Sequence, residues 1–321
     1  MHQSDTIAPA DNEGIERAAR LLLSGGLVAF PTETVYGLGA DATNDRAVAA
    51  VFAAKERPQF NPLIVHVQDF QSARRLAEFC PAAIELAQAF WPGPLTLVLP
   101  RKRNSGVSLL VSAGLDTMAI RVPASQVARR LLAAASIPIA APSANRSGHV
   151  SPTTAEHVAN DFGSGIDLLL DGGRTAVGIE STVIGFENGS AVMLRPGAIT
   201  REQIERSAVS LHASTVLRVS SPGQLASHYA PHTPLRLNAR EVRDDEVLLA
   251  FGGKELPSAL GIRNLSRAGD LKEAAANLFR MLRELDEARA GCIAVMPIPE
   301  HGLGEAINDR LRRAAAPRGT T

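Results

Sequence analysis

Two positively charged side chains, Lys55 and Arg57, lie two residues apart at the end of a predicted helix. Pro58 and Pro62 stiffen the loop that follows, and Asn61 lies between them. A guanidinium group binds phosphate oxygens through a fork of N–H groups, and an ammonium group adds a mobile point charge. The pair therefore suits a polyanion such as a nucleoside triphosphate. Cations that face the C-terminal dipole of a helix are an equally good interpretation of the pattern.

A second segment, 141–158, is rich in hydroxyl and amide side chains, among them Ser143 and Ser151. Ser151 followed by Pro152 predicts the N-cap and first turn of a helix over 153–160. The start of a helix offers unpaired N–H groups and the positive end of a dipole, which together bind phosphate. The segment therefore favours phosphate binding, with a simple capped helix as the alternative.

A third polar segment, 31–41, follows a predicted buried strand over 27–30. It carries the hydroxyl groups of Thr32 and Thr34 and the carboxylate of Glu33. Loops that leave the ends of strands are where α/β proteins bind their ligands. A turn held by local hydrogen bonds between side chains and backbone is the alternative.

Arg121 and Arg195 lie in or at the end of predicted strands. An unpaired guanidinium group would be costly there, so each needs an anion, either a structural carboxylate or a carboxylate or phosphate of a ligand. His66 alternates with apolar neighbours in a strand and is either a satisfied core histidine or a residue that faces a ligand. Ser181 could hydrogen-bond a small polar ligand.

These segments offer cations and hydroxyl groups but no pair of nucleophile and general base. The set favours binding of an anionic nucleotide beside a small zwitterion, with direct transfer at phosphorus. The string GLGADA at 37–42 matches a dinucleotide loop, but PTETVY separates it from the preceding strand and no acidic residue follows at the expected offset. His228 and His232 are four residues apart, yet Pro231 disfavours the helix that would bring them together.

Composition and charge narrow the class of protein. The 321 residues carry 33 Lys and Arg against 33 Asp and Glu, a formal net charge of zero, whereas proteins that bind nucleic acid usually carry a basic surplus. No apolar run approaches the roughly 18 residues that a membrane helix needs, and the first residues lack the pattern of a secretory signal. Cys80 and Cys292 cannot form a disulfide framework or a zinc cage. We therefore expect a cytoplasmic protein without a membrane segment.

The elements that must position these residues alternate between helix and strand. Residues 1–210 predict one α/β domain with a twisted, mixed sheet, residues 211–235 a proline-containing linker, and residues 236–321 a smaller α/β domain with a parallel sheet. Helices are expected over 12–24, 45–54, on either side of Pro81, and over 125–135, 153–160, 200–207, 271–288 and 303–314. Strands are expected over 27–30, 63–67, 95–99, 118–122, 137–141, 167–170, 181–186, 191–194, 247–251, 261–265 and 292–296.

Several strings, taken in chain order, closely resemble the YrdC-like family. They are FPTETVYGLGAD, KERPQFNPLIVHV, FWPGPLTLVLP, AIRVP, APSANRSGHVSPT, GIESTVI and LRPG. With the linker string SPGQLASHYAP over 221–231, the chain resembles the two-domain threonylcarbamoyl-AMP synthases of that family. The resemblance implies a twisted α/β sheet with a large basic cavity, a Rossmann-like second domain, and a linker that lies over the cavity.

The resemblance also implies a reaction. L-threonine, bicarbonate or carbon dioxide, and ATP would give threonylcarbamoyl-AMP and pyrophosphate, and a separate transferase complex would use the product to modify the adenosine beside the anticodon of tRNA. Direct tRNA binding would not be required. Magnesium would bridge the phosphates and need few protein ligands, so no metal ligand is assigned to the chain. The alternatives are an RNA-binding, translation-associated module without catalysis, which zero net charge disfavours, and an ATP-using carbamoyl-transfer enzyme, whose extra acylphosphatase-like and zinc-finger regions are not found in the sequence.

The motifs imply site residues one by one. Threonine would be held by Thr34, His66, Arg121, the backbone at Ala141, and Ser181. ATP would be held by Arg57, Asn61, Thr117, Ser143, Ser151, Arg195 and Tyr229. Lys55 and Arg57 would neutralise charge where bicarbonate and the phosphates meet. Glu56 stands between them where a small residue is common, and its role is left open.

Overall fold

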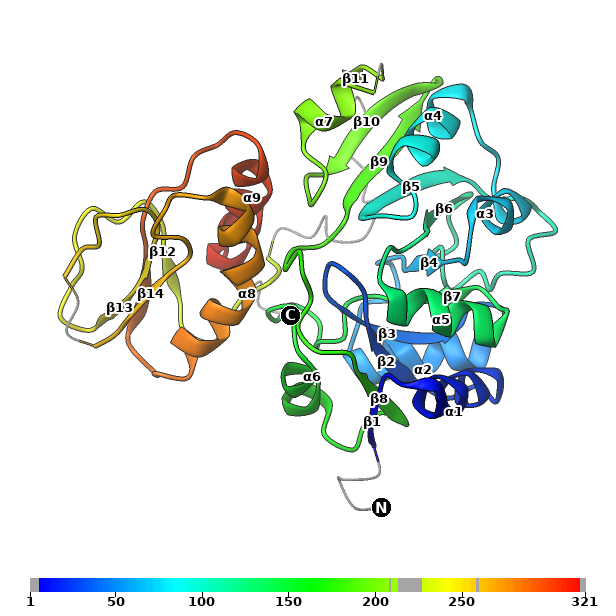
Figure 1. Cartoon of the computed structure of the whole chain (residues 1–321), viewed down its shortest axis with the longest axis horizontal. Coiled ribbons are helices and arrows are strands. Elements are labelled where there is room, and N and C mark those ends of the chain that lie inside the picture. Colours follow the sequence, from blue (N-terminus) through cyan, green and yellow to red (C-terminus); the bar gives the residue numbers. More distant parts are fainter. Residues whose placement is uncertain (1–5, 208, 213–226, 258–259, 318–321) are drawn as a thin grey trace.

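The computed structural model describes residues 6–207, 209–212, 227–257 and 260–317. These residues form an eleven-stranded mixed sheet and a separate four-stranded parallel sheet, each with its own helices (Figure 1). The α/β class, with a large mixed sheet followed by a small parallel one, is as predicted. Of the predicted linker, residues 213–226 lie outside the described residues. Part of the string over 221–231 therefore lies outside them as well.

The large sheet has the strand order β1-β8-β2-β3-β7-β4-β6-β5-β9-β10-β11. Its strands are β1 (Ile7–Pro9), β2 (Val28–Pro31), β3 (Tyr36–Asp41), β4 (Ile64–His66), β5 (Leu95–Pro100), β6 (Thr117–Arg121), β7 (Ile139–Ala140), β8 (Leu168–Asp171), β9 (Thr182–Glu187), β10 (Ser190–Arg195) and β11 (Leu211–His212). The helices that accompany it are α1 (Asn12–Leu23), α2 (Asp45–Lys55), α3 (Phe70–Leu76), α4 (Pro81–Phe90), α5 (Gln126–Ala135), α6 (Ala155–Phe162) and α7 (Arg201–Glu205).

The helices begin and end where local chemistry requires. In α1, the Asp11 carboxylate accepts a hydrogen bond from Gly14 N at 2.8 Å, which satisfies one of the unpaired N–H groups of the first turn. In α2, the Asn44 side chain does the same, and the helix ends where Glu56 adopts a left-handed φ of 53°. That turn ends the helix at Lys55 and starts the loop that carries Arg57.

One segment that the sequence suggested as a ligand loop is largely a strand. Thr32 closes a tight turn, with its Oγ1 donating to the Val35 carbonyl at 2.7 Å, and the chain returns as β3, antiparallel to β2 and β7. A Cβ on Gly39 would lie 2.7 Å from a ring carbon of Phe30, so glycine is needed there for close packing of the strands. These glycines therefore serve sheet packing, in agreement with the rejection of a dinucleotide loop.

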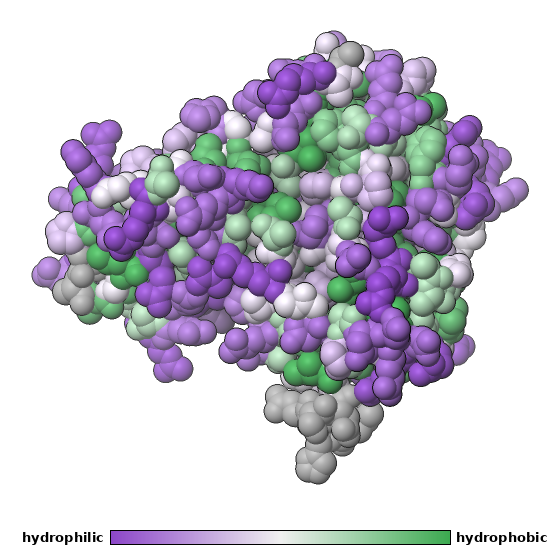
Figure 2. Space-filling view, in the orientation of Figure 1, coloured by the Kyte–Doolittle hydropathy of each residue, from purple (hydrophilic) through white to green (hydrophobic). Residues whose placement is uncertain are grey.

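The small sheet has the order β12-β15-β13-β14. Its elements are β12 (Leu235–Arg236), β13 (Glu246–Ala250), β14 (Ile262–Asn264), β15 (Cys292–Val295), α8 (Leu271–Asp286) and α9 (Leu303–Ala315). Helices α8 and α9 lie between this sheet and the large unit (Figure 1). No helix of the described residues is both long and apolar enough to cross a membrane. On the face shown in Figure 2, hydrophilic residues cover most of both units and hydrophobic residues appear in small, scattered areas.

The two units share part of one apolar core. The cluster formed by the inner faces of α8, α9 and the small sheet also includes Val35, Val150, Ile179 and Tyr229 of the rest of the chain. Gly178 approaches α8 so closely that a Cβ on it would lie 2.5 Å from the Ala276 Cα atom. Burial of a continuous apolar surface favours one fixed arrangement of the two units.

Replacement of Gly178 by alanine tests this close approach. The added methyl group would overlap backbone atoms of α8, including the Ala275 carbonyl oxygen at 2.6 Å, and backbone cannot move aside as a flexible side chain can. We expect the free energy of unfolding to fall by about 1–3 kcal/mol more than in a matched control, as measured by urea denaturation.

The matched control is Gly189→Ala. Gly189 has nearly the same backbone conformation, with φ of 81° against 78° for Gly178, but nothing lies within 4 Å of a Cβ built there. Both substitutions therefore carry the cost of left-handed backbone, about 1–2 kcal/mol, and only Gly178→Ala adds the overlap. Equal losses in the two variants would contradict the packing argument.

Candidate active site

A single cavity collects most of the predicted site residues. It lies against the β2–β3 turn, strands β4, β6 and β10, and residues 228–229 of the predicted linker, and its empty volume is about 550 Å³. The predicted site residues that line it are Thr34, Arg57, His66, Arg121, Ala141, Ser143, Ser181, Arg195 and Tyr229.

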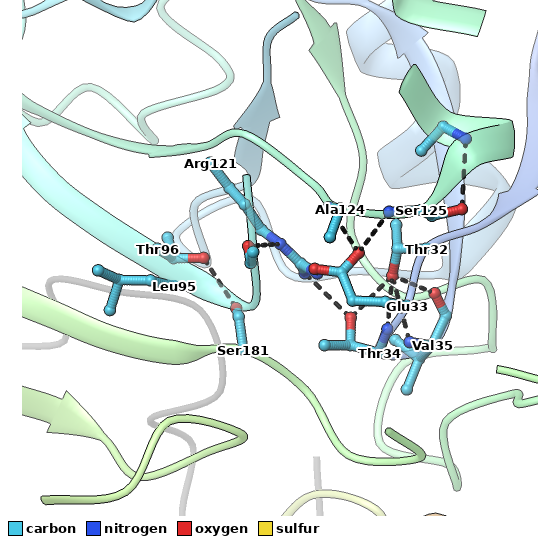
Figure 3. A network of polar contacts seen from close by, with 12 residues as sticks. Thr32, Glu33, Thr34, Val35, Leu95, Thr96, Arg121, Ala124, Ser125 and Ser181 are labelled. Atoms are coloured by element: carbon cyan, nitrogen blue, oxygen red, sulfur yellow. Dashed lines mark hydrogen bonds and ion pairs between the residues drawn. The ribbon is translucent and has the colours of Figure 1, made fainter. Parts of the chain in front are cut away.

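At one end of the cavity, Arg121 is fixed by acceptors of this chain (Figure 3). Its Nη2 donates to Glu33 Oε1 at 2.6 Å and its Nη1 to Thr34 Oγ1 at 3.0 Å. The other oxygen of Glu33 accepts from the backbone N–H groups of Ala124 and Ser125, both at 3.1 Å. Burial by itself would raise the pKa of Glu33, but the charge and hydrogen bonds of Arg121 lower it below its usual value. The anion that Arg121 required is therefore a structural carboxylate.

Ser181 lies beside this end of the cavity. Its Oγ is 2.8 Å from Thr96 Oγ1 of β5 (Figure 3), so Thr96, which the sequence analysis did not single out, belongs to the same network. The Ser181 carbonyl accepts from Arg195 Nη2 at 2.8 Å. Parallel pairing of β5 with β9 sets Leu95 opposite Thr182, which explains why the two hydroxyl groups meet.

His66 stands in β4 with Arg121 of β6 and Ile139 of β7 opposite it. Its side chain is buried, and its Nδ1 has no hydrogen-bond partner among the described residues. Burial, together with the positive charge of Arg121, lowers the pKa of His66 to about 3. The imidazole is therefore neutral at pH 7. It lines the cavity, and its contact with a ligand stays a prediction.

The Lys55 ammonium lies buried beneath the cavity wall instead of lining it. It donates to the carbonyl oxygens of Ser143, at 2.6 Å, and of Asn145. Burial, followed by the charge of Arg57, lowers the pKa of Lys55 well below its usual value. Lys55 therefore anchors the loop that brings Ser143 to the cavity.

Arg57 reaches the cavity from its loop. Its Nε donates to the Asn61 carbonyl at 3.0 Å and its Nη2 to the Pro62 carbonyl at 2.8 Å. Burial lowers the pKa of Arg57 to about 10, so the group stays charged at neutral pH. Asn61 contributes this backbone anchor, and its buried Oδ1 has no partner within the described part of the chain. Glu56 points outward, with a side chain that is 71% exposed and paired with Arg146.

Ser151 is held behind the cavity by a carboxylate. Its hydroxyl donates to Glu180 Oε1 at 2.5 Å, and Glu180 itself lines the cavity. The prediction that Ser151 caps a helix over 153–160 is wrong: α6 begins at Ala155, and its cap is Thr154, whose hydroxyl accepts from the backbone of the first turn. Because the helix begins four residues after Ser151, the cap position falls on Thr154.

Thr117 is placed apart from the other predicted residues. It begins β6, opposite Pro100, whereas Arg121 at the other end of the same strand lines the cavity. Four residues of extended strand span about 13 Å. The structure therefore does not bring Thr117 to the cavity.

His228 and Tyr229 form the wall supplied by the predicted linker. Tyr229 has a left-handed φ of 64°. This backbone state is uncommon for a bulky residue and often occurs at functional sites. Its ring stacks on Phe279 of α8 at 5.6 Å between centroids. The Tyr229 hydroxyl and His228 Nδ1 are buried and have no partner among the residues described. His232 points elsewhere and contacts Asp286, so the two histidines form no pair, as predicted.

Arg310 of α9 is the residue that the sequence analysis missed most clearly. It is fully buried and donates to Glu180 Oε2 at 2.8 Å. The signal was present in the sequence: Arg310 falls on the same face of the predicted helix as Ile307 and Leu311, a position expected to be apolar. Glu180 and Thr32 also line the cavity without having been assigned a role.

Two family profiles match consecutive parts of this chain. The Sua5–YciO–YrdC family profile, described as "Telomere recombination", matches residues 20–197, and the profile "Threonylcarbamoyl-AMP synthase, C-terminal domain" matches residues 199–316. A threonylcarbamoyl-AMP synthase of Pyrococcus abyssi is 41% identical over 323 residues, which cover 94% of each chain. One of Bacillus subtilis is 42% identical over 324 residues, which cover 95% of this chain and 93% of the relative.

The chain belongs to the threonylcarbamoyl-AMP synthase family. The crystal structure of the P. abyssi Sua5 protein complexed with L-threonine has a TM-score of 0.87 to this chain at 38% identity, covering 97% of this chain and 96% of that one. Membership confirms the YrdC-like resemblance, the fold and the synthase activity that the sequence predicts. It sets aside a non-catalytic RNA-binding module.

The depressed pKa of His66 predicts acid sensitivity. Because the folded state holds this imidazole neutral, with a pKa of about 3 against 6.5, the unfolded chain binds a proton that the folded chain does not. Stability is therefore full above pH 6.5 and falls as the pH drops towards 3, by about 1.4 kcal/mol per pH unit for this group. His66→Gln should make the fall between pH 7 and pH 5 less steep in urea unfolding.

The control for this experiment is His301→Gln, because the His301 side chain is exposed. It should keep the slope of the unmodified chain. An unchanged slope in His66→Gln would contradict the burial of a neutral imidazole.

Proposed function

We propose that this chain makes threonylcarbamoyl-AMP in the cavity described above, from L-threonine, bicarbonate or carbon dioxide, and ATP, with release of pyrophosphate. The observation that carries the proposal is that one cavity is lined both by hydrogen-bonding groups and by buried cations. Arg121, Thr34 and Ser181 supply hydrogen-bonding groups, and Arg57 and Arg195, of which Arg195 contacts Ser181, add buried positive charge. A zwitterion and a polyanion can therefore lie side by side.

Threonine fits the Arg121 end. Glu33 holds the guanidinium group in place, so that it attracts the threonine carboxylate without having to reorganise. The hydroxyl groups of Thr34 and Ser181 and the neutral ring of His66 are hydrogen-bonding groups of the size that a short hydroxylated side chain needs. These contacts would favour threonine over amino acids without a hydroxyl group, because a missing partner leaves buried polar groups unpaired.

The triphosphate fits beside Arg57 and Arg195. Both guanidinium groups are buried, and the hydrogen bonds of Arg57 given above go to backbone carbonyls. Backbone carbonyls satisfy N–H groups but do not neutralise charge, so a polyanion in the cavity would neutralise the charge of Arg57. Ser143 and the unpartnered hydroxyl of Tyr229 are further groups for the nucleotide, whereas the placement of Thr117 gives its assignment no support.

The reaction needs no covalent enzyme intermediate. The threonine amine attacks the carbon of the carbon dioxide or bicarbonate, forming an N–C bond and an N-carboxylate, with loss of a proton and, from bicarbonate, of hydroxide as water. A carboxylate oxygen then attacks the α-phosphorus of ATP while the bond to pyrophosphate breaks. The chain aligns the reactants and stabilises the developing negative charge with Arg57 and the Lys55-anchored loop.

We infer that magnesium enters with ATP and is not held by a protein site of its own. No group of three or more His, Cys, Asp or Glu side chains that could hold a metal occurs in the described part of the chain. The carboxylate that lines the cavity, Glu180, already accepts from Ser151 and Arg310. Magnesium bound to phosphates and water would supply charge neutralisation, which agrees with its need for few protein ligands.

The predicted linker contributes to the site through His228 and Tyr229. The predicted place of the whole linker over the cavity also involves residues 213–226, which lie outside the described residues. The product would pass to a tRNA threonylcarbamoyl transferase complex in the cytoplasm, and direct tRNA binding is not required, which zero net charge supports.

Release of pyrophosphate tests the reaction. The full chain is incubated with ATP, magnesium, L-threonine and bicarbonate, and each of the last two is omitted in turn. Because the phosphoryl acceptor forms from both compounds, we expect the signal to disappear when either is left out. Pyrophosphate release that continues without threonine would contradict the proposed reaction.

Arg57→Ala tests the role of the cavity cations. Loss of a buried donor aimed at developing charge costs about 100- to 1000-fold in turnover, and we expect kcat/KM for ATP to fall by about that factor. Glu56→Gln is the control, because Glu56 is its exposed neighbour in the chain and surface ion pairs contribute little. Circular dichroism and thermal unfolding report any structural part of the effect, since Arg57 also anchors two carbonyl groups. Unchanged turnover in Arg57→Ala would remove it from the chemistry.

A further inference from the structure

The carboxylate of Glu180 lies in the wall of the cavity that we propose for the triphosphate. Glu180 is only 6% exposed and stands near Arg195. An uncompensated carboxylate there would repel the phosphates across a region of low dielectric, where charge interactions are strong. We therefore expect groups behind the cavity wall to neutralise this charge in addition to Arg195.

Arg310 meets this need from the second unit. Its Nε donates to Glu180 Oε2 at 2.8 Å, while Ser151 donates to Oε1 at 2.5 Å. Its Nη1 donates to the Pro196 carbonyl at 2.9 Å and to Asp309 Oδ2 at 2.7 Å. Both oxygens of Glu180 are thus held by donors of the chain, and the pair keeps the pKa of Glu180 below its usual value even though burial alone would raise it.

The same guanidinium group supports the linker wall. The Arg310 Cζ atom lies 5.2 Å from the centre of the Tyr229 ring, within the range of a cation–π contact. Phe279 of α8 stacks on the same ring. The second unit therefore holds Tyr229, which lines the cavity, through one residue of each of its helices.

Stability alone does not account for an arginine at this position. Arg310 has no exposed surface, and its Nη2 has no hydrogen-bond partner among the described residues. A buried ion pair contributes little or nothing to stability compared with well-packed apolar side chains of similar volume. An apolar residue would also continue the face of α9 that carries Ile307 and Leu311.

We propose that Arg310 is a positioning residue of the nucleotide site, which neutralises Glu180 and fixes Ser151 and Tyr229, so that the second unit completes the cavity. This inference rests on the proposed function, because it assigns the Glu180 side of the cavity to ATP. It gives the C-terminal unit a defined part in the reaction.

Arg310→Met in the full chain separates this role from general stability. Removal of Arg310 leaves Glu180 without its ion-pair partner behind the cavity, so we expect the KM for ATP to rise by about 10- to 100-fold and the KM for L-threonine to change by less than about threefold. Arg310→Lys, which keeps the charge but not the fork of N–H groups, should raise the KM for ATP less than Arg310→Met does. Equal rises for both substrates, or no rise for ATP, would overturn the proposal.

The matched control is Glu305→Gln. It removes the ion pair between Arg201 and Glu305, at 3.1 Å, which also joins α9 to the first unit but is partly exposed and away from the cavity. We expect both KM values to stay at those of the unmodified chain. A rise in the KM for ATP in this control would mean that any weakened contact between the units has the same effect, which would overturn a specific role for Arg310.

A rescue experiment gives the decisive readout. In the double variant Glu180→Gln/Arg310→Met the negative charge of Glu180 is gone, so the KM for ATP should recover by about tenfold relative to Arg310→Met. A merely structural role predicts the opposite, because the second substitution would add its own damage. A double variant no better than Arg310→Met would overturn the proposal, also in the case where Arg310→Met alone is poorly folded by circular dichroism.

Failure of this inference can be told apart from failure of the proposed function. If the unmodified chain releases pyrophosphate only with threonine and bicarbonate, but the Arg310 variants keep its KM for ATP, only the role of Arg310 is wrong. If the unmodified chain shows no such dependence, the proposed function is wrong. Calorimetric titration of ATP into the unmodified chain and into Arg310→Met then tests the positioning role without turnover.

Discussion

The burial of positive charge around one cavity is the constraint on which the rest of this structure depends. A guanidinium or ammonium group removed from water loses a large hydration energy, which must be offset by hydrogen bonds and by opposite charge. Lys55, Arg57 and Arg195 obtain their hydrogen bonds mainly from backbone carbonyls of nearby loops. Those loops must then follow fixed paths, which explains the prolines, tight turns and irregular backbone around the cavity.

The two ends of the cavity meet this constraint in different ways. At the Arg121 end the carboxylate of Glu33 balances the charge, so the guanidinium group is neutralised and rigid before any ligand arrives. At the Arg57 end, the hydrogen bonds of the Arg57 guanidinium group go to backbone carbonyls, which accept N–H groups but carry no negative charge. A neutralised, rigid end suits a zwitterion whose side chain must be distinguished, whereas a charged end suits a polyanion that is bound through its phosphates.

The second unit is part of the same arrangement. The apolar faces of its helices share a core with Val35 and Val150 of the large unit. Arg310 lies at the same interface and donates a hydrogen bond to Glu180. Glu180 thereby faces the cavity without presenting an unpaired charge. The hydrophobic contact holds the two units together, and the ion pair sets the electrostatics of the wall that they share.

The sequence by itself determined the class of fold and most of the members of the site. Hydrophobic periodicity located the helices and strands, because burial of an apolar face follows the repeat of each element, and the polar motifs named nine residues that line the cavity. Only the tertiary structure decided that 36–41 is a strand and that Ser151 hydrogen-bonds Glu180 instead of capping a helix. It also decided that Thr117 lies away from the cavity. Local patterns cannot show these facts, because partners such as Glu33 and Arg121 or Glu180 and Arg310 lie 88 and 130 residues apart. The partner of a buried charge is chosen by the packing of the whole chain, and the sequence carries only the requirement that some partner exists.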